Sequence, residues 1–172
     1  KNLGLPLTQI DKVSKIDIVI DGADETDMKL NLIKGGGGAL LQEKIVASNS
    51  NKMIVIVDSS KVVENLGKFP LPIEIVKFGC NSTKNQIEKM LYDIGYSNFS
   101  MNWRKENDNF FITDEKHYIL DLHLKKIKDP SFLNKIINHI PGVVETGLFI
   151  KIANQVIVGD DKGNIKLIKE EG

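Results

Sequence analysis

The chain has 172 residues, of which 41% are hydrophobic and 27% are charged, a composition that indicates a folded globular protein and excludes a disordered one. Its 23 basic and 23 acidic residues cancel, so no overall field favours binding to nucleic acid or to an anionic membrane. The single cysteine, Cys80, excludes an internal disulfide and a multi-cysteine metal site, and we expect a reducing compartment, the cytoplasm.

The first predicted elements form a strand–helix–strand unit. Residues 16–20 are a near-continuous β-branched run, which is typical of a strand covered on both faces. Residues 35–38 are all glycine and cannot form a stable helix interior, because each glycine costs about 1 kcal/mol there relative to alanine. Residues 39–46 then predict a helix with one apolar side and with the polar residues 42–44 between its apolar positions. Residues 53–57 are the next buried strand, so the sheet should be parallel here.

The order of elements changes after the proline-marked boundary at residues 69–72. The strands predicted beyond it cover residues 73–77, 99–103, 110–113, 118–123 and 143–150, and the helices cover residues 82–94 and the segment from Asp129 to the stop at Pro141. This order is close to β-α-β-β-α-β, the ferredoxin-like arrangement. Two last strands, at residues 155–158 and 165–168, flank a turn and are expected to return to the first sheet.

We therefore expect an α/β protein with a Rossmann-like, mostly parallel sheet that has helices on both faces, plus a ferredoxin-like α+β second domain. The expected catalytic domain comprises residues 1–70 and 148–172, and residues 71–147 are expected to form the lid or interface domain. Because a parallel sheet would need more strands before residue 16, we also expect these residues to be part of a longer protein.

Three familiar ligand-binding motifs do not fit the acidic turn and the glycine run. An EF-hand counted from Asp21 would need glutamate at its twelfth position, where Leu32 stands. A P-loop has its lysine after the glycines, whereas Lys34 precedes them. A dinucleotide fingerprint counted from Gly35 would need glycine at position 40, which is leucine.

The same residues could nevertheless form a binding site for a small molecule. Four glycines that open a helix leave backbone N–H groups free to bind a phosphate or to stabilise an oxyanion or enediolate, although a flexible surface loop is the alternative. Asp21 ends a parallel strand, where open α/β sheets bind their ligands, or it is simply a helix cap or turn residue. If Glu43, near the start of the helix, has no functional role, it is a solvated charge favoured by the helix dipole. Lys61 in that case is an ordinary surface lysine.

The remaining polar residues limit the kinds of site. His117, His123 and His139 are scattered and lack the spacing of metal ligands, so no metal is expected. Arg104 is the only arginine, and an anion must therefore be held mostly by lysine and by backbone N–H groups.

Several motifs taken jointly resemble the ribose-5-phosphate isomerases of the A type, in the right order and over essentially the whole chain. The motifs that carry the resemblance are Asp21-Gly-Ala-Asp-Glu25, Lys34-Gly-Gly-Gly-Gly-Ala39 with Glu43-Lys-Ile45, Asp58-Ser-Ser-Lys61, Gly67-Lys-Phe-Pro-Leu-Pro-Ile-Glu74, and Ile140-Pro-Gly-Val-Val144 with Gly147-Leu-Phe149.

The resemblance implies an aldose–ketose isomerase that interconverts ribose 5-phosphate and ribulose 5-phosphate in the non-oxidative pentose phosphate pathway, without metal or organic cofactor. Glu43 would be the general base that moves a proton between C2 and C1 through an enediolate, which suits a carboxylate whose pKa is raised by desolvation. The partner would be the pentose phosphate, with neither nucleic acid nor membrane, and we expect a homo-oligomer, most simply a dimer.

The resemblance also implies how the substrate is held. Asp21 and Asp24 would hold sugar hydroxyls, and Asp21 could assist the opening of the furanose ring. Lys34 and the glycine amides would hold the developing oxyanion, and Lys61 would face the phosphate. The substrate-binding residues carried over in this way are Asp21, Gly22, Ala23, Asp24, Lys34, Gly35, Gly36, Gly37 and Lys61.

Two departures from the family's pattern stand out. The Gly/Ser/Thr-rich phosphate loop that the family has near its N-terminus is not in these residues, which is a further reason to expect a longer protein. Gln42 stands where many relatives carry arginine. The alternatives to the isomerase are a sugar-phosphate sensor or deaminase-like relative of the same fold, and a non-catalytic protein whose ferredoxin-like unit mediates interactions.

Overall fold

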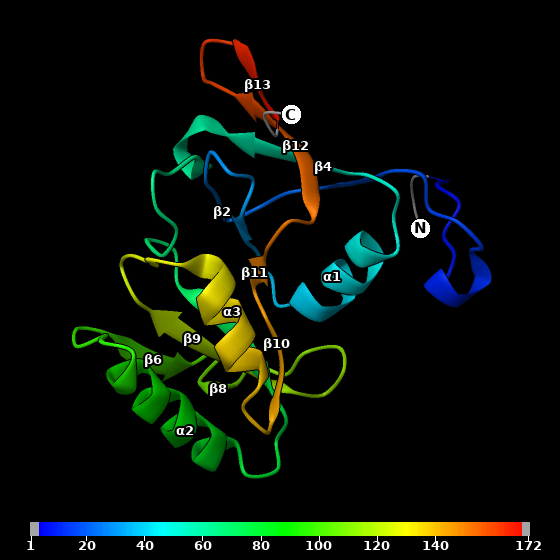
Figure 1. Ribbon diagram of the computed structural model, residues 1–172. Helices are drawn as coiled ribbons and strands as arrows, with labels where there is room; N and C mark the ends of the chain where they lie inside the picture. The colour runs from blue at the N-terminus through cyan, green and yellow to red at the C-terminus, as the bar shows by residue number, and fades with distance from the viewer. Residues whose placement is uncertain (1–3, 170–172) are drawn as a thin grey trace.

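The first sheet of the protein has four strands in the order β1-β4-β12-β13 in the computed structural model, which describes residues 4–169 (Figure 1). The strands are β1 (Val19–Asp21), β4 (Met53–Asp58), β12 (Ala153–Gly159) and β13 (Ile165–Lys169). The pairs β1–β4 and β4–β12 are parallel, and β13 returns antiparallel to β12. The predicted mostly parallel sheet and the return of the last hairpin to it are both confirmed.

The coverage of this sheet differs from the prediction. On one face Val55 and Val57 are buried in a core that includes Phe149. On the other face Ile20 is 62% exposed and Ile56 is 52% exposed. The prediction that the strands are covered on both faces is wrong for the part of the chain that the structure describes, because no element within it packs against these isoleucines.

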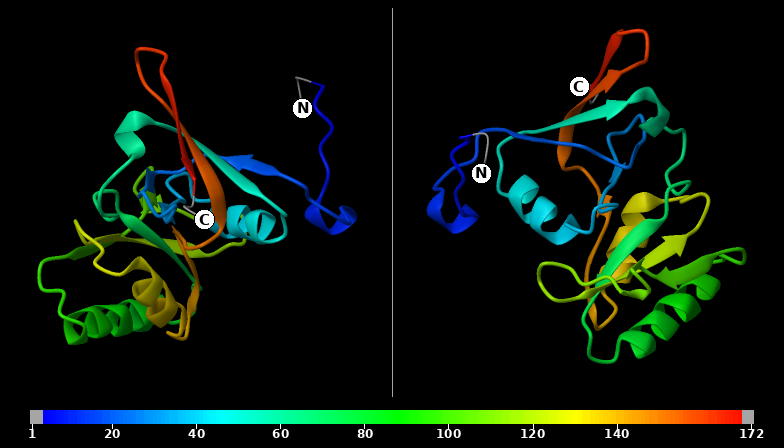
Figure 2. Two further views of the ribbon diagram at one scale, coloured as in Figure 1. Left: turned by 45° about the horizontal axis from the view of Figure 1, so that its top comes forward. Right: turned by 180° about the vertical axis from the view of Figure 1, so that it is seen from behind.

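The second sheet has the strand order β10-β5-β9-β6 with every pair antiparallel. Its elements in chain order are β5 (Leu71–Ile75), α2 (Cys80–Asp93), β6 (Ser100–Trp103), β9 (Tyr118–His123), α3 (Pro130–Asn138) and β10 (Val143–Thr146). Both helices share one core with the sheet, through residues such as Ile87 and Leu133 (Figure 2). This is the predicted ferredoxin-like arrangement, and we call it the ferredoxin-like unit.

One predicted strand of this unit has a different form. Of the segment expected as a strand at residues 110–113, Phe110 lies in a short hairpin of β7 (Lys105–Glu106) with β8 (Asn109–Phe110), and Ile112 forms only an isolated bridge. The chain reverses there because Asn107 and Asp108 both adopt positive φ, at 47° and 64°. The residues after the hairpin keep one bridge to the sheet, between Ile112 and Tyr118 of β9.

A small three-stranded sheet, β11-β3-β2, lies between the two larger sheets (Figure 1). Its strands are β2 (Glu25–Thr26), β3 (Leu32–Ile33) and β11 (Leu148–Phe149). The strand predicted over residues 143–150 is broken at Gly147 into β10 and β11. Gly147 donates its N–H to the Pro72 carbonyl, 2.7 Å away, and its own carbonyl accepts from the Lys34 N–H at 2.9 Å. One segment therefore connects the ferredoxin-like unit to Lys34.

The remaining elements are the helix α1 (Leu40–Ser48) and two short 3₁₀ turns, η1 (Ile10–Lys12) and η2 (Ser59–Lys61). None of the helices found between residues 4 and 169 has the length and apolarity to cross a membrane. We propose that residues 1–70 with 148–172, and residues 71–147, correspond to two domains, with the second boundary at Gly147.

The first prediction concerns Gly147. A Cβ at this position would overlap the Lys34 carbonyl oxygen and would lie 2.8 Å from Cδ of Pro72. Gly147→Ala should therefore lower the free energy of unfolding by about 1–3 kcal/mol, as overpacking does, measured by urea denaturation. Gly159→Ala is the control, because nothing lies within 4 Å of the added methyl group. Equal stability of the two variants would contradict the proposed role of Gly147.

Candidate active site

The ammonium group of Lys34 lies among oxygen atoms contributed by the end of β1 and by α1. Its side chain is 4% exposed, and Nζ lies 2.9 Å from Oδ2 of Asp21 and 3.3 Å from Oε2 of Glu43. It also donates to the Gly22 carbonyl at 2.6 Å. Asp21 ends β1, Lys34 follows β3, and Glu43 lies in the first turn of α1. The expected convergence of these three side chains is present.

The acidic turn divides into two structural and two site-facing carboxylates. Glu25 is 3% exposed and accepts the N–H groups of Gly67 at 2.7 Å and Phe69 at 2.6 Å. The Asp27 carboxylate accepts backbone N–H groups of its own turn. Asp24 instead accepts the Gly36 N–H at 2.8 Å. Asp21 and Asp24 are thus the members of the turn that face Lys34 and the glycine loop, residues 35–38.

Glu43 is a carboxylate poised to take a proton. Burial raises the pKa of Glu43 above its ordinary value of 4.5, and it does so against the nearby ammonium of Lys34, which lowers this pKa, while the negative charge of Asp21 raises it further. The Oε2 atom is buried, and the Lys34 ammonium lies 3.3 Å from it. The carboxylate therefore combines a raised pKa with an ion pair to a buried cation.

Gly22, Ala23 and Lys61 line a cavity of about 510 Å³ at the carboxyl end of the parallel strands. The other residues around it include Asp58 and Asp160. Lys61 is held in η2, where the Asp58 side chain accepts the Ser60 N–H. The structure thus brings the expected binding residues to one edge of the sheet, although within residues 4–169 Lys61 forms no hydrogen bond or ion pair with the Lys34 cluster. A larger cavity, of about 870 Å³, lies elsewhere and is lined by none of the expected site residues.

Lys44 is a residue whose position sequence reasoning did not predict. The helix pattern placed it among polar residues between the apolar positions, with Ile45 on the apolar side. In the structure Lys44 is 9% exposed and Ile45 is 43% exposed, so this part of the prediction is wrong. The reason is a specific set of acceptors: Nζ donates to the carbonyls of Thr146 at 2.7 Å and Leu148 at 2.8 Å, and it lies 2.9 Å from Oε1 of Glu145. These contacts use all three donors of the ammonium.

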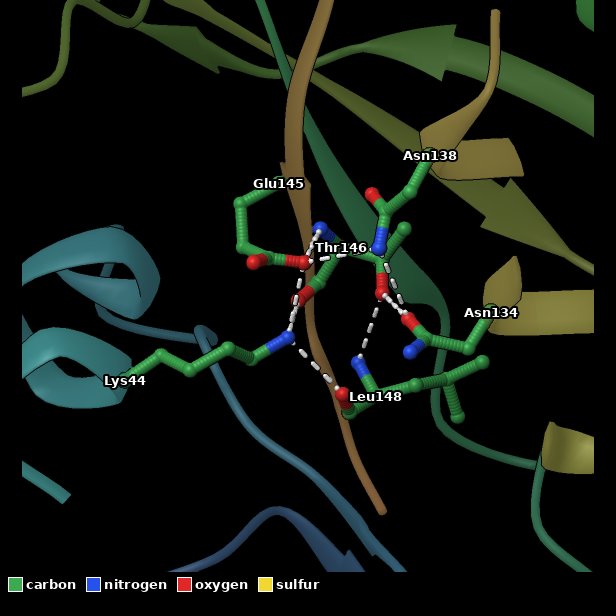
Figure 3. A network of polar contacts seen from close by, with 6 residues as sticks. All are labelled: Lys44, Asn134, Asn138, Glu145, Thr146 and Leu148. Carbon is green, nitrogen blue, oxygen red and sulfur yellow. Dashed lines mark hydrogen bonds and ion pairs between the residues drawn. The ribbon is translucent and has the colours of Figure 1, made fainter. Parts of the chain in front are cut away.

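The Lys44 network joins α1 to the ferredoxin-like unit (Figure 3). Glu145 also accepts from Asn138 of α3 at 3.1 Å, and the Thr146 hydroxyl donates to Asn134 of the same helix. Burial lowers the pKa of Lys44, and the charge of Glu145 opposes this shift. The buried Phe149 ring lies 4.8 Å from Nζ of Lys44 and 5.5 Å from Nζ of Lys34, so the two lysines share one aromatic neighbour. The network therefore fixes the helix that carries Glu43.

Comparisons with known proteins agree with this geometry. The family model described as "Ribose 5-phosphate isomerase A (phosphoriboisomerase A)" matches residues 1–163. The chain is 48% identical over 167 residues to a "Ribose-5-phosphate isomerase A" of Dinoroseobacter shibae, an alignment that covers 97% of this chain and 64% of the relative. The chain thus spans a little under two thirds of the length of that relative.

The chain also resembles solved structures of ribose 5-phosphate isomerases. A "Ribose 5-phosphate isomerase from Plasmodium falciparum" superimposes with a TM-score of 0.91 at 39% identity, covering 99% of this chain and 73% of that chain. A "D-Ribose-5-Phosphate Isomerase" in complex with phospho-erythronic acid superimposes with a TM-score of 0.83 at 37% identity, covering 96% of this chain and 70% of that chain.

The second prediction concerns the Lys44 network. Lys44→Met removes the cation that neutralises the largely buried Glu145, and should lower the free energy of unfolding by about 3–5 kcal/mol in urea denaturation. Adding Glu145→Gln to this variant should restore part of the loss. Lys89→Met, at an exposed position of α2, is the matched control. A Lys44→Met protein as stable as the control would show that the network contributes nothing.

The third prediction is the pH dependence of stability at Glu43. Because the pKa of Glu43 is raised on folding, its contribution to stability is fully present below 4.5 and is lost as the pH rises through the folded-state pKa. Glu43→Gln removes this loss. The variant should therefore have a higher melting temperature than the natural protein at pH 7, with the difference shrinking as the pH falls towards 4. Glu88→Gln, exposed on α2, controls for the loss of one charge. A Glu43→Gln protein with a lower melting temperature than the natural protein at pH 7 would contradict this prediction.

Proposed function

The chain belongs to the ribose 5-phosphate isomerase A family, and we propose that the complete protein interconverts D-ribose 5-phosphate and D-ribulose 5-phosphate at the Lys34 cluster. The observation that carries this proposal is the Glu43 carboxylate, which has a raised pKa and a buried oxygen 3.3 Å from the buried ammonium of Lys34. A general base and an oxyanion stabiliser side by side are what proton transfer next to a carbonyl requires.

In the proposed reaction Glu43 removes the proton from C2 of the open-chain aldose. The electron pair of that C–H bond forms the C1–C2 double bond, and the carbonyl π electrons move to O1, which becomes the enediolate oxyanion. Lys34 and the glycine amides stabilise this charge. A proton passes from the C2 hydroxyl to O1, and protonated Glu43 then returns its proton to C1, which gives the ketose.

The other site residues are proposed to bind the sugar. Asp21 and Asp24 would accept hydrogen bonds from its hydroxyls, and Asp21, already beside Lys34, would assist ring opening. Gly22 and Ala23 would line the path to the phosphate, and Lys61 would supply a positive charge for it at the rim of the same cavity. That a related isomerase binds phospho-erythronic acid, a phosphorylated sugar acid, supports this substrate class.

We further propose a cytoplasmic homodimer in which the ferredoxin-like unit contributes a lid or a subunit contact. The lone cysteine supports a reducing compartment. Phe78 is 94% exposed and Phe132 is 48% exposed on this unit, and a subunit contact would cover such apolar surface. The isomerase is supported over a sensor or an interaction module by the names of the relatives and by the arrangement around Glu43.

The fourth prediction is the effect of Glu43→Gln on turnover. Loss of a general base typically costs 10²–10⁴-fold, so kcat of the full-length variant should fall by roughly that factor while ribose 5-phosphate still binds. The measurement is a coupled assay with ribose 5-phosphate, in which a chelator should leave the natural protein fully active. Glu88→Gln should behave as the natural protein. Near-normal turnover of Glu43→Gln would eliminate the proposed mechanism.

A further inference from the structure

Arg104 is the only arginine of the chain, and its guanidinium joins the ferredoxin-like unit to the glycine loop. On one side it forms a bidentate pair with Asp121 of β9, with Nε 3.0 Å from Oδ2 and Nη2 2.5 Å from Oδ1. On the other side Nη1 donates to the carbonyl oxygens of Gly35 at 2.7 Å and Gly36 at 3.0 Å. The Arg104 side chain is 15% exposed, so these charge-assisted bonds are largely shielded from water.

The two carbonyls that Arg104 holds determine where the neighbouring N–H groups point. The Gly35 carbonyl shares a planar trans peptide with the N–H of Gly36, and the Gly36 carbonyl shares one with the N–H of Gly37. In a trans peptide the N–H points away from the carbonyl oxygen. With both oxygens bound by Arg104, both N–H groups point to the opposite side, and the Gly36 N–H does meet Asp24 there, at 2.8 Å. Gly37 is exposed, and a ligand can approach its backbone.

Phe111 holds the other end of the same loop. Gly38 has a φ of 89°, and a Cβ there would overlap the Phe111 ring. Phe111 is itself connected to Arg104, because its N–H donates to the Arg104 carbonyl at 2.9 Å and its ring lies 5.9 Å from the guanidinium carbon. A run of four glycines has the largest backbone freedom of any sequence, so these outside contacts, together with the 3.0 Å bond from the Gly38 N–H to the Gly35 carbonyl, restrict it to one conformation.

A cation on a carbonyl oxygen also acts through the peptide group. It polarises the amide, which makes the N–H of the same peptide a stronger donor. Arg104 therefore both orients the Gly36 and Gly37 amides and strengthens them. The Gly36 N–H is engaged by Asp24, so the exposed Gly37 N–H is the one that can meet a developing negative charge.

We propose that Arg104 is a positioning residue for catalysis, which holds the glycine loop by its carbonyls so that the Gly36 N–H meets Asp24 and the Gly37 N–H is directed at the developing oxyanion. This inference deepens the proposed function and rests on it. It assigns the ferredoxin-like unit a part in the chemistry, in addition to any role as a lid or subunit contact.

The test uses the full-length protein with Arg104→Met and Arg104→Lys. Arg104→Met should lower kcat by about 10–100-fold, somewhat less than the loss of an oxyanion donor itself, while KM changes less than about 3-fold. Arg104→Lys should not restore kcat, because one ammonium cannot hold Asp121 and two carbonyls at once. Glu115→Ala is the control: it breaks the exposed 2.9 Å contact from Gln42 to Glu115, which links the same two parts of the chain without touching the loop carbonyls.

Two readouts are independent of turnover. In Arg104→Met the amide proton resonances of Gly36 and Gly37 should shift upfield, and phospho-erythronic acid should bind more weakly, whereas Glu115→Ala should leave both unchanged. Unaltered kcat and unaltered glycine resonances in Arg104→Met would overturn the inference while the proposed function stands. If the natural protein shows no isomerase activity, the proposed function fails, and the amide resonances still report whether Arg104 orients the loop.

Discussion

The arrangement of this protein depends on one buried ammonium group. Lys34 is almost fully enclosed, and a buried charge is tolerated only where opposite charges and dipoles surround it. The carboxylate of Asp21 and the carbonyl of the adjacent Gly22, at the end of β1, meet this requirement together with the carboxylate of Glu43 in α1. Since Lys34 has to be neutralised, it holds the end of β1 and the start of α1 together. As a result, the base Glu43 and the cation Lys34 lie side by side in one site.

Contacts from the ferredoxin-like unit also position the residues of this site. The Gly147 carbonyl accepts a hydrogen bond from the Lys34 N–H, and the Lys44 network beside it fixes the helix that carries Glu43. Arg104 holds the glycine loop on the other side. These three contacts hold Lys34, α1 and the glycine loop, so the position of the reacting groups depends on packing between the two units and not on the first sheet alone.

Much of the fold and the centre of the site could be predicted from sequence because the signals are local. β-branched runs, proline boundaries and caps such as Asp129 predicted the strands and helices, and the rule for the carboxyl ends of parallel strands placed Asp21 near the glycine loop. The burial of Lys44 and the role of Arg104 could not be predicted in this way, because their partners lie about 100 and 70 positions away along the chain. The contacts of Glu25 with Gly67 and Phe69 also join residues far apart in sequence, so its structural role could not be predicted. The exposure of Ile20 and Ile56 was also missed, since a β-branched run reports that a face is apolar and not whether another element covers it.

The most direct test of this account is the titration of the Glu43 carboxyl group by ¹³C NMR in the natural protein and in Lys34→Met. The account predicts a pKa above 4.5 in the natural protein, because desolvation outweighs the attraction of Lys34, and a still higher pKa in Lys34→Met, because that attraction is removed. A pKa at or below 4.5 in the natural protein, or the same pKa in both proteins, would contradict the claim that the buried ammonium and the buried carboxylate form one coupled site.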